Sequence, residues 1–148
     1  RVRILGFVPD EDVPRLYAAA EFLAYPSLYE GFGIPVAEAM ACGCAVLTSS
    51  RSSLPEIAGK AALLVDPLDT TALAVGVRRL SEDVGLRARL RAAGPQQAAR
   101  FSWSAAAGQY LGLFRETIAE FRGQPAMQSA VPARAQDGVF FPPVEVGV

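Results

Sequence analysis

Short apolar runs alternate with amphipathic stretches along most of the chain. Four of these runs have the length and the flanking residues of buried strands, and we expect strands at 2–8, 21–27, 44–50 and 61–66. Apolar residues at helical spacing follow each run, which predicts helices between and after the strands. Continuously apolar strands that alternate with helices are typical of a parallel sheet that is covered on both faces.

Capping residues and helix breakers set the expected helix ends. We expect Asp10 to cap the first helix, Pro35 to open a helix that ends before Gly43, and residues 54–59 to form a single turn. A further helix is expected to begin near Asp69 or Thr70.

The C-terminal third of the chain is expected to be helical. Residues 85–101 read as a helical stretch that Gly94-Pro95 interrupts, and residues 102–121 as a final helix. Four residues of the final helix recur at helical spacing and are expected in the core: Trp103, Tyr110, Leu113 and Phe114.

Four strands are few for a complete doubly wound domain. The fold class that fits best is α/β, with residues 1–122 forming half of a Rossmann-like parallel sheet followed by C-terminal helices. From Gly123 the pattern dissolves into Gln, Pro, Gly and small residues, and we expect residues 123–148 to be a tail without fixed structure. The chain starts with Arg and enters a strand at once, so we expect it to be a piece of a longer protein.

Composition narrows the chemistry. The net charge is −1 and no basic stripe is present, so we expect no nucleic-acid partner. The 148 residues include no His, which excludes a His metal ligand, a His general base and a Ser-His-Asp triad within the chain. Cys42 and Cys44 lie two apart in an apolar segment and are expected to be small buried side chains rather than a disulfide or a zinc site.

The segment 28–43 places Gly31-Phe32-Gly33 between two acids, Glu30 and Glu38, where a strand ends and a helix begins. Ligands of open parallel sheets bind at this edge, and a helix N-terminus attracts phosphate. Glycines let the backbone approach a ligand, and carboxylates accept hydrogen bonds from sugar hydroxyls. The residues alone leave two interpretations open, a nucleotide-sugar site or a glycine turn with two solvated acids.

The sequence "EGFGIPVAE" (30–38) resembles the Glu–seven residues–Glu signature of retaining, metal-independent glycosyltransferases of the GT-B fold, the group 1 or family 4 type. Residues 4–74 are similar to this family along their whole length, and the similarity weakens to about residue 122. The stretch 51–69 looks most like members that transfer mannose. The chain resembles only the second half of the C-terminal, donor-binding domain of these enzymes.

The resemblance implies a role for each residue of the motif. Glu30 would be the catalytic candidate and would accept hydrogen bonds from the donor hexose, while Glu38 would bind the ribose hydroxyls. The backbone N–H groups of the glycine loop would face the sugar, and the start of the helix would face the diphosphate. The implied substrate-binding residues are Glu30, Gly31, Phe32, Gly33, Ile34, Val36 and Glu38.

The implied reaction is transfer of a hexose, mannose or glucose, from a GDP- or UDP-linked donor to an unknown glycan or lipid acceptor, with retention. No metal and no cofactor beyond the donor are expected. The N-terminal GT-B domain is missing, so we expect the chain alone to be inactive. The resemblance is to bacterial enzymes of polysaccharide biosynthesis, which implies a cytoplasmic location and peripheral contact with the inner face of the membrane. The alternatives are a nucleotide-sugar epimerase of the same fold and a non-catalytic nucleotide-sugar-binding domain.

Four other groups of residues have a functional and a structural interpretation. Asp66 and Asp69 could suggest a metal site, but a strand end and a helix cap are favoured. Glu56 is expected to stabilise its own turn rather than reach the site. One of the serines in 49–53 could touch the donor. Five arginines are expected on a solvated face, with an anionic membrane surface as the alternative: Arg78, Arg79, Arg87, Arg89 and Arg91.

Overall fold

The computed structural model describes residues 2–123, so the expectation for residues 124–148 lies outside the described residues. Three parallel strands form one sheet in the order β1-β2-β3. The strands are β1 (Phe22–Tyr25), β2 (Ala45–Ser49) and β3 (Leu63–Val65). The expected α/β fold with a parallel sheet is therefore present, with three of the four expected strands.

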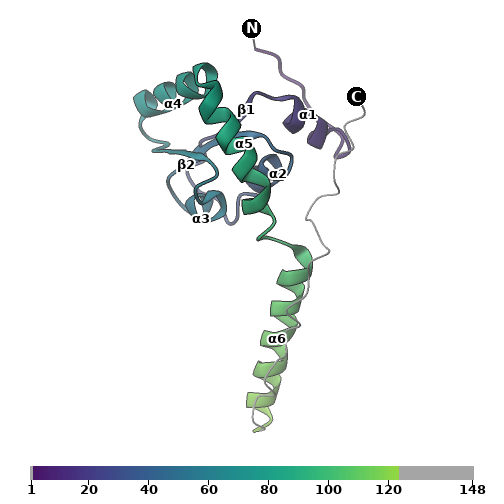
Figure 1. Cartoon of the computed structure of the whole chain (residues 1–148). Coiled ribbons are helices and arrows are strands. Elements are labelled where there is room, and N and C mark those ends of the chain that lie inside the picture. Colours follow the sequence, from purple (N-terminus) through teal and green to yellow (C-terminus); the bar gives the residue numbers. More distant parts are fainter. Residues whose placement is uncertain (1, 124–148) are drawn as a thin grey trace.

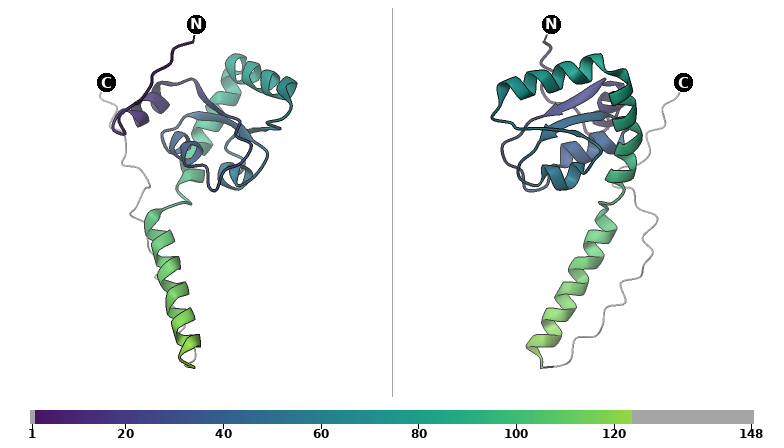
Figure 2. Two further views of the ribbon diagram at one scale, coloured as in Figure 1. Left: turned by 180° about the vertical axis from the view of Figure 1, so that it is seen from behind. Right: turned by 60° about the vertical axis from the view of Figure 1, so that its left-hand side comes forward.

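Helices cover both faces of this sheet (Figures 1 and 2). They are α1 (Val13–Ala19), α2 (Ile34–Ala41), α3 (Leu54–Ala58), α4 (Thr70–Glu82), α5 (Val84–Ala98) and α6 (Trp103–Phe121). Figure 2 shows α4 lying across the sheet and α5 running down one side of it toward α6. Figure 1 shows α6 leading away from this body.

The central strand β2 is buried along its whole length because it has a strand on each side and helices on both faces. Its side chains alternate between the two faces, as the pleat of a strand requires. Val46 packs with α2, α3 and the end of α5, whereas Ala45 and Leu47 pack with α4 and the first half of α5. Thr48 also faces inward, and its hydroxyl donates to the Tyr25 carbonyl at 2.9 Å.

Side-chain caps fix the start of the later helices. Asp69 accepts from the Ala72 N–H at 2.9 Å at the start of α4, which confirms that expected cap. Asp83 accepts from the Leu86 N–H at 2.8 Å at the start of α5. The expected cap at Asp10 is wrong, because α1 starts after Asp12, whose side chain makes no capping bond.

Residues 2–8 do not form the expected strand. They have no regular structure, and the side chains of Val2, Ile4 and Phe7 are exposed. The sheet contains only β1, β2 and β3 among residues 2–123. An apolar run becomes a strand only where a neighbouring strand pairs with it, and no described strand lies beside this one.

The break expected at Gly94-Pro95 is also absent, since α5 continues through Pro95. Gly94 is buried where α5 crosses α2, and a Cβ there would lie 2.9 Å from the Met40 carbonyl oxygen. Pro95 removes one helical N–H, but the buried side chains of Leu90 and Ala98 anchor α5 on either side of it. Gly94 therefore serves close helix packing rather than a helix end.

The apolar stripe of α6 is not in the core. The side chains of Trp103, Tyr110 and Phe114 are 65%, 62% and 57% exposed, and that of Leu113 is also exposed. Helical spacing predicted the amphipathic helix correctly, but spacing does not show whether another surface covers the apolar face. Within residues 2–123, none of the helices combines the length and apolarity needed to cross a bilayer.

Candidate functional site

The loops that follow β1 and β2 meet at one edge of the sheet, because parallel strands end on the same side. Ser52 and Ser53, from the loop after β2, hold the backbone of the loop after β1. The Ser52 hydroxyl donates to the Glu30 carbonyl at 2.6 Å and accepts from the Glu30 N–H at 3.1 Å. The Ser53 hydroxyl lies 3.0 Å from the Glu30 carbonyl and 2.9 Å from the Phe32 carbonyl. The main chain of the loop that carries the glycines is thus fixed by hydrogen bonds with two serine hydroxyls.

The carboxylate of Glu30 is held by the strand that precedes it. The Tyr25 hydroxyl donates to Glu30 Oε1 at 2.6 Å. This bond, with a second from Ser27, lowers the pKa of Glu30 below its usual value, because hydrogen bonds to the charged form favour it. Glu30 is therefore an anion at neutral pH.

The two glycines of the loop differ in what the fold requires of them. Gly33 has φ of 102° and immediately precedes α2, and a Cβ there would lie 2.6 Å from Leu54 Cδ2. Gly31 has no positive φ, and a Cβ there would meet nothing within 4 Å. The fold needs a glycine at position 33 and tolerates a side chain at position 31.

The first turn of α2 has one open amide. The N–H groups of Val36 and Ala37 donate to the Gly33 carbonyl at 3.0 and 3.2 Å, and Pro35 has no N–H. The Ile34 N–H finds no acceptor among residues 2–123. Val36 is fully buried, so its side chain cannot touch a ligand and only its already bonded N–H remains near the helix end. Ile34 is the better placed of the two expected diphosphate contacts.

Glu38 lies one turn further along α2, on the side facing α1. The Tyr17 hydroxyl donates to Glu38 Oε2 at 3.3 Å. The pKa of Glu38 is raised, mainly because the side chain is partly buried. The hydrogen bond from Tyr17 lowers this pKa, and the negative charge of Asp10 raises it further. The pKa of Tyr17 is also raised, first by burial and then by the negative charge of Glu38. The two acids are thus held by tyrosines from two different elements, and along the chain they lie before and after the first turn of α2.

Phe32 and Ile34 also line a cavity of about 630 Å³ between α2, α3 and the start of α6. Glu56, Trp103 and Tyr110 lie along its other walls. The Phe32 ring meets the Phe101 ring edge to face, with centroids 5.5 Å apart. Glu56 is in the first turn of α3, as expected, and in addition faces this cavity.

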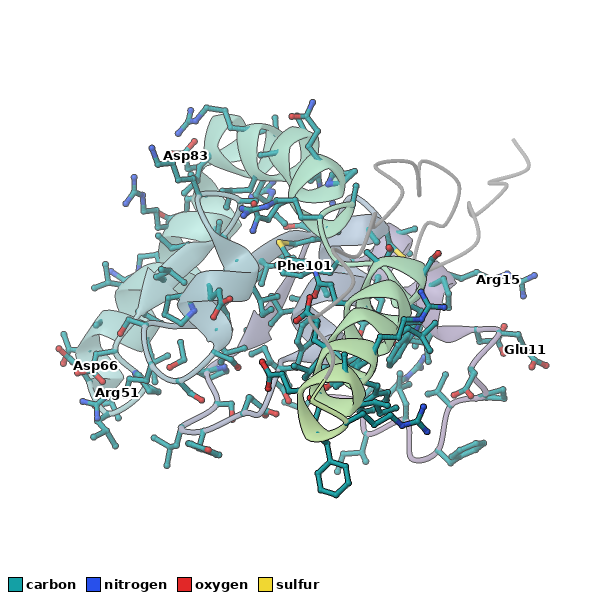
Figure 3. The ribbon with its side chains drawn as sticks, turned by 90° about the horizontal axis from the view of Figure 1, so that it is seen from below. Glu11, Arg15, Arg51, Asp66, Asp83 and Phe101 are labelled. Carbon is teal, nitrogen blue, oxygen red and sulfur yellow. The ribbon has the colours of Figure 1, made fainter. Side chains whose placement is uncertain are left out.

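Asp66 and Asp69, the two acids considered as a metal site, have structural partners. Asp66 receives two N–H···O bonds from Arg51, both at 3.1 Å, which lower the pKa of its carboxyl (Figure 3). It also accepts from the Leu68 N–H at 3.0 Å. Across residues 2–123, no three His, Cys, Asp or Glu side chains are grouped so that they could hold a metal ion.

The cysteines and arginines were predicted partly correctly. Cys42 and Cys44 are free thiols, and Cys44 is buried, in agreement with their interpretation as small apolar side chains. Arg87 and Arg91 are not simply solvated, because Arg87 donates to the Ser81 carbonyl at 2.7 Å and Arg91 to the Ala20 carbonyl at 2.7 Å. Three arginines are exposed as expected: Arg78, Arg79 and Arg89.

The sequence patterns did not predict that Tyr17 and Tyr25 hold the two acids, and they marked Ser52 only as one of several serines that could touch the donor. Tyr17, Tyr25 and Ser52 have no spacing relation to the motif that would mark them. The predicted loop between a strand end and a helix start was correct, and the neighbouring loop that contacts Glu30 is the one that carries these serines.

Comparison with known proteins decides the family. The family model for glycosyl transferases group 1 matches residues 1–97. The chain belongs to this family. It is 45% identical over 114 residues to the O-antigen chain mannosyltransferase B of Escherichia coli, an alignment covering 77% of this chain and 30% of that protein. It is 37% identical over 127 residues to a D-inositol 3-phosphate glycosyltransferase of Salinispora tropica, covering 82% and 26%.

The fold comparison agrees with this group 1 assignment. The sucrose-phosphate synthase of Thermosynechococcus elongatus superposes with a TM-score of 0.73 at 34% sequence identity, covering 81% of this chain and 31% of that one. The predicted Rossmann-like α/β fold of the GT-B type and the predicted family are both confirmed. The chain spans less than a third of the length of these relatives.

Proposed function

We propose that this group 1 chain forms the donor side of an enzyme that transfers a hexose from a nucleotide diphosphate sugar to an acceptor hydroxyl, with retention. The observation that carries the proposal is the arrangement around Glu30. Tyr25 fixes its ionised carboxylate, the open backbone of Gly31 follows it in the loop, and the free amide of Ile34 lies further along, at the start of α2. A carboxylate that accepts hydrogen bonds from sugar hydroxyls and an amide that donates a hydrogen bond to a phosphate oxygen are the two groups that a nucleotide sugar needs.

The diphosphate would lie against the start of α2. Charge develops on the leaving diphosphate during transfer, and an amide with the partial positive charge of the helix end would stabilise it. Glu38 would accept the ribose hydroxyls from one turn further along. Phe32 and Gly33 would contribute backbone groups toward the sugar. The Val36 amide already donates to the Gly33 carbonyl and would add only to the partial positive charge of the helix end. No metal ion and no further cofactor are part of the proposal.

Mannose is the proposed sugar because the Escherichia coli relatives are named as mannosyltransferases. The base would be guanine or uracil, and the acceptor a glycan or lipid that a further part of the protein binds. We place the enzyme in the cytoplasm, at the inner face of the membrane. A binding module without catalysis is the second candidate for the chain as it stands, since it spans less than a third of its relatives.

Calorimetry on the full gene product that carries these residues tests the proposal, with GDP-mannose, GDP, UDP-glucose and UDP as ligands. We expect Glu38→Gln to weaken both a sugar nucleotide and its nucleoside diphosphate, and Glu30→Gln to weaken the sugar nucleotide alone. Each loss should be about 1–3 kcal/mol, the value for a hydrogen bond to a charged group. Wild-type affinity in both variants would contradict the proposal. Product formation from GDP-mannose separates the enzyme from the binding module.

A further inference from the structure

Glu30 is held at both ends by residues outside its motif. Ser52 exchanges two hydrogen bonds with the Glu30 backbone, at 2.6 and 3.1 Å, and the Tyr25 hydroxyl bonds Oε1 of the carboxylate at 2.6 Å. We propose that Ser52 and Tyr25 are positioning residues that aim the Glu30 carboxylate at the donor hexose, an inference that rests on the proposed function. Ser52 would set the position of the backbone, and Tyr25 would set the direction of the carboxylate.

The backbone of Ser52 is strained. Its φ is 59°, and it is the only non-glycine residue with positive φ among residues 2–123. A side chain in this left-handed region costs free energy, and such strain persists only where surrounding contacts maintain it. Here the Ser53 hydroxyl lies beside the same Glu30 carbonyl, and the paired Arg51 and Asp66 tie the loop to the end of β3.

Tyr25 acts on the other end of Glu30. A 2.6 Å bond from a hydroxyl to a carboxylate is short and charge-assisted, and it fixes Oε1, while the carboxylate keeps further lone pairs that can accept from a ligand. The groups facing the carboxyl are Tyr25 from β1 and Ser27 from the following loop, and both lower the pKa of Glu30. Arg51, the cation of the adjoining loop after β2, is paired with Asp66 instead. Tyr25 therefore orients the carboxylate and keeps it ionised.

The test uses the difference in affinity between a sugar nucleotide and its nucleoside diphosphate, which isolates the contact with the hexose. Calorimetry on the full gene product measures GDP-mannose against GDP, and UDP-glucose against UDP. We expect Ser52→Ala, Ser52→Gly and Tyr25→Phe each to weaken the sugar nucleotide about three- to tenfold, while the nucleoside diphosphate stays within about twofold. Ser52→Gly removes the hydroxyl and the strain together, so it keeps the test valid if Ser52→Ala folds poorly.

The pH dependence separates the two positioning residues. Binding of the hexose is lost as Glu30 is protonated, and Tyr25→Phe removes a bond that lowers the pKa of Glu30. The acidic limit of sugar-nucleotide binding should therefore move to higher pH in Tyr25→Phe and stay in place in Ser52→Ala. Ser50→Ala and Tyr29→Phe are matched controls, since they lie in the same loops and their hydroxyls make no hydrogen bond described within residues 2–123.

Each outcome decides between the two proposals. If Glu30→Gln removes the hexose contribution but Ser52→Ala and Tyr25→Phe keep it, the positioning role is wrong and the proposed function stands. An equal loss of sugar nucleotide and nucleoside diphosphate in these variants shows a purely structural role and also overturns the inference. If neither pair of ligands binds, or if Glu30→Gln retains the full hexose contribution, the proposed function fails and the inference fails with it.

Discussion

A Cβ at Gly33 would lie 2.6 Å from Leu54 Cδ2, whereas a Cβ at Gly31 would meet nothing within 4 Å. The positive φ of Gly33 adds backbone strain to that clash. The fold therefore requires a glycine at position 33 but does not require one at position 31. Gly33 shapes the entry to α2, and the open backbone at Gly31 is free to approach a ligand.

We predict that Gly33→Ala destabilises the chain by about 1–3 kcal/mol, the range for a forced clash or a strained backbone. Gly31→Ala should change the stability by less than about 0.5 kcal/mol, as is usual for open surface sites. Gly31→Ala should nevertheless weaken GDP-mannose binding, because the new methyl group would keep the sugar from the backbone. Urea unfolding and calorimetry measure the two effects. A stable Gly33→Ala variant would show that the loop adapts.

We expect the ionised Glu38 side chain to lower the stability of the fold at neutral pH while it contributes to nucleotide binding. Burial raises its folded pKa, so the folded state binds the proton more tightly than the unfolded state does. Stability attributable to this group is therefore lost as pH rises from the usual pKa of a glutamate through the raised folded value. We predict that Glu38→Gln, which cannot ionise, raises the melting temperature at pH 7 while it weakens nucleotide binding. At a pH below both pKa values, the melting temperatures of the variant and the wild type should converge.

The sequence identifies the acids of the site but not their supports. Glu30 and Glu38 stand out because carboxylates are rare in an apolar stretch and because their spacing resembles a family signature. Tyr17 and Ser52 contact them across 21 and 22 residues of chain. Such contacts depend on how α1 and the loop after β2 pack against the motif, which no local pattern encodes.

At the scale of elements, the crossing of α2 and α5 is set by a single small residue. A Cβ at position 94 would lie 2.9 Å from the Met40 carbonyl oxygen. Backbone cannot move aside as a flexible side chain can. The helix that carries the start of the candidate site is therefore packed directly against α5.

We predict that Gly94→Ala destabilises the chain by about 1–3 kcal/mol through overpacking, despite the better helix propensity of Ala. The matched control is Gly108→Ala in α6, where a Cβ would meet nothing within 4 Å. There the change should stabilise the helix by up to about 1 kcal/mol. Thermal or urea unfolding compares the two variants. Equal shifts in the same direction would contradict this account of the crossing.

Element positions followed from periodicity, with two informative errors. The apolar runs at 21–27, 44–50 and 61–66 contain β1, β2 and β3, because each has a neighbouring strand and a helical cover. The run at 2–8 has the same composition but no described partner. In the sequence, Gly94-Pro95 resembles a helix break. In the structure, the glycine allows close packing and the proline lies on the exposed side of α5.

At the scale of the whole molecule, α6 is set apart from the α/β body (Figure 1). Its aromatic and aliphatic side chains are largely exposed, so few buried contacts oppose its opening. Backbone amides in such an element exchange through local unfolding rather than through global unfolding. The body, in contrast, is built around the fully buried β2.

We predict that in the 148-residue chain the amides of α6 exchange with solvent faster than those of β2, α2 and α5. Hydrogen–deuterium exchange with peptide resolution measures this directly. The difference should exceed about a factor of ten, which corresponds to about 1.4 kcal/mol in the free energy of opening. Protection of α6 equal to that of β2 would mean that α6 unfolds only with the body.

The fold class could be predicted from sequence because alternating apolar strands and amphipathic helices allow few arrangements. The exposure of α6 could not, since an amphipathic helix has the same pattern whether its apolar face is covered or bare. The cavity between α2, α3 and the start of α6 could not be predicted from the sequence either, because its walls come from three separate parts of the chain.

The paired hydrogen bonds between Ser52 and the Glu30 backbone have a practical meaning for protein engineering. Grafting residues 30–38 onto another parallel sheet would transplant both acids without the hydroxyls that hold them in place. A donor site moved to a new scaffold would need the β2–α3 loop, the last residue of β1 and part of α1 as well. The smallest transferable unit is thus the first two βα units together with α1, rather than the nine-residue motif.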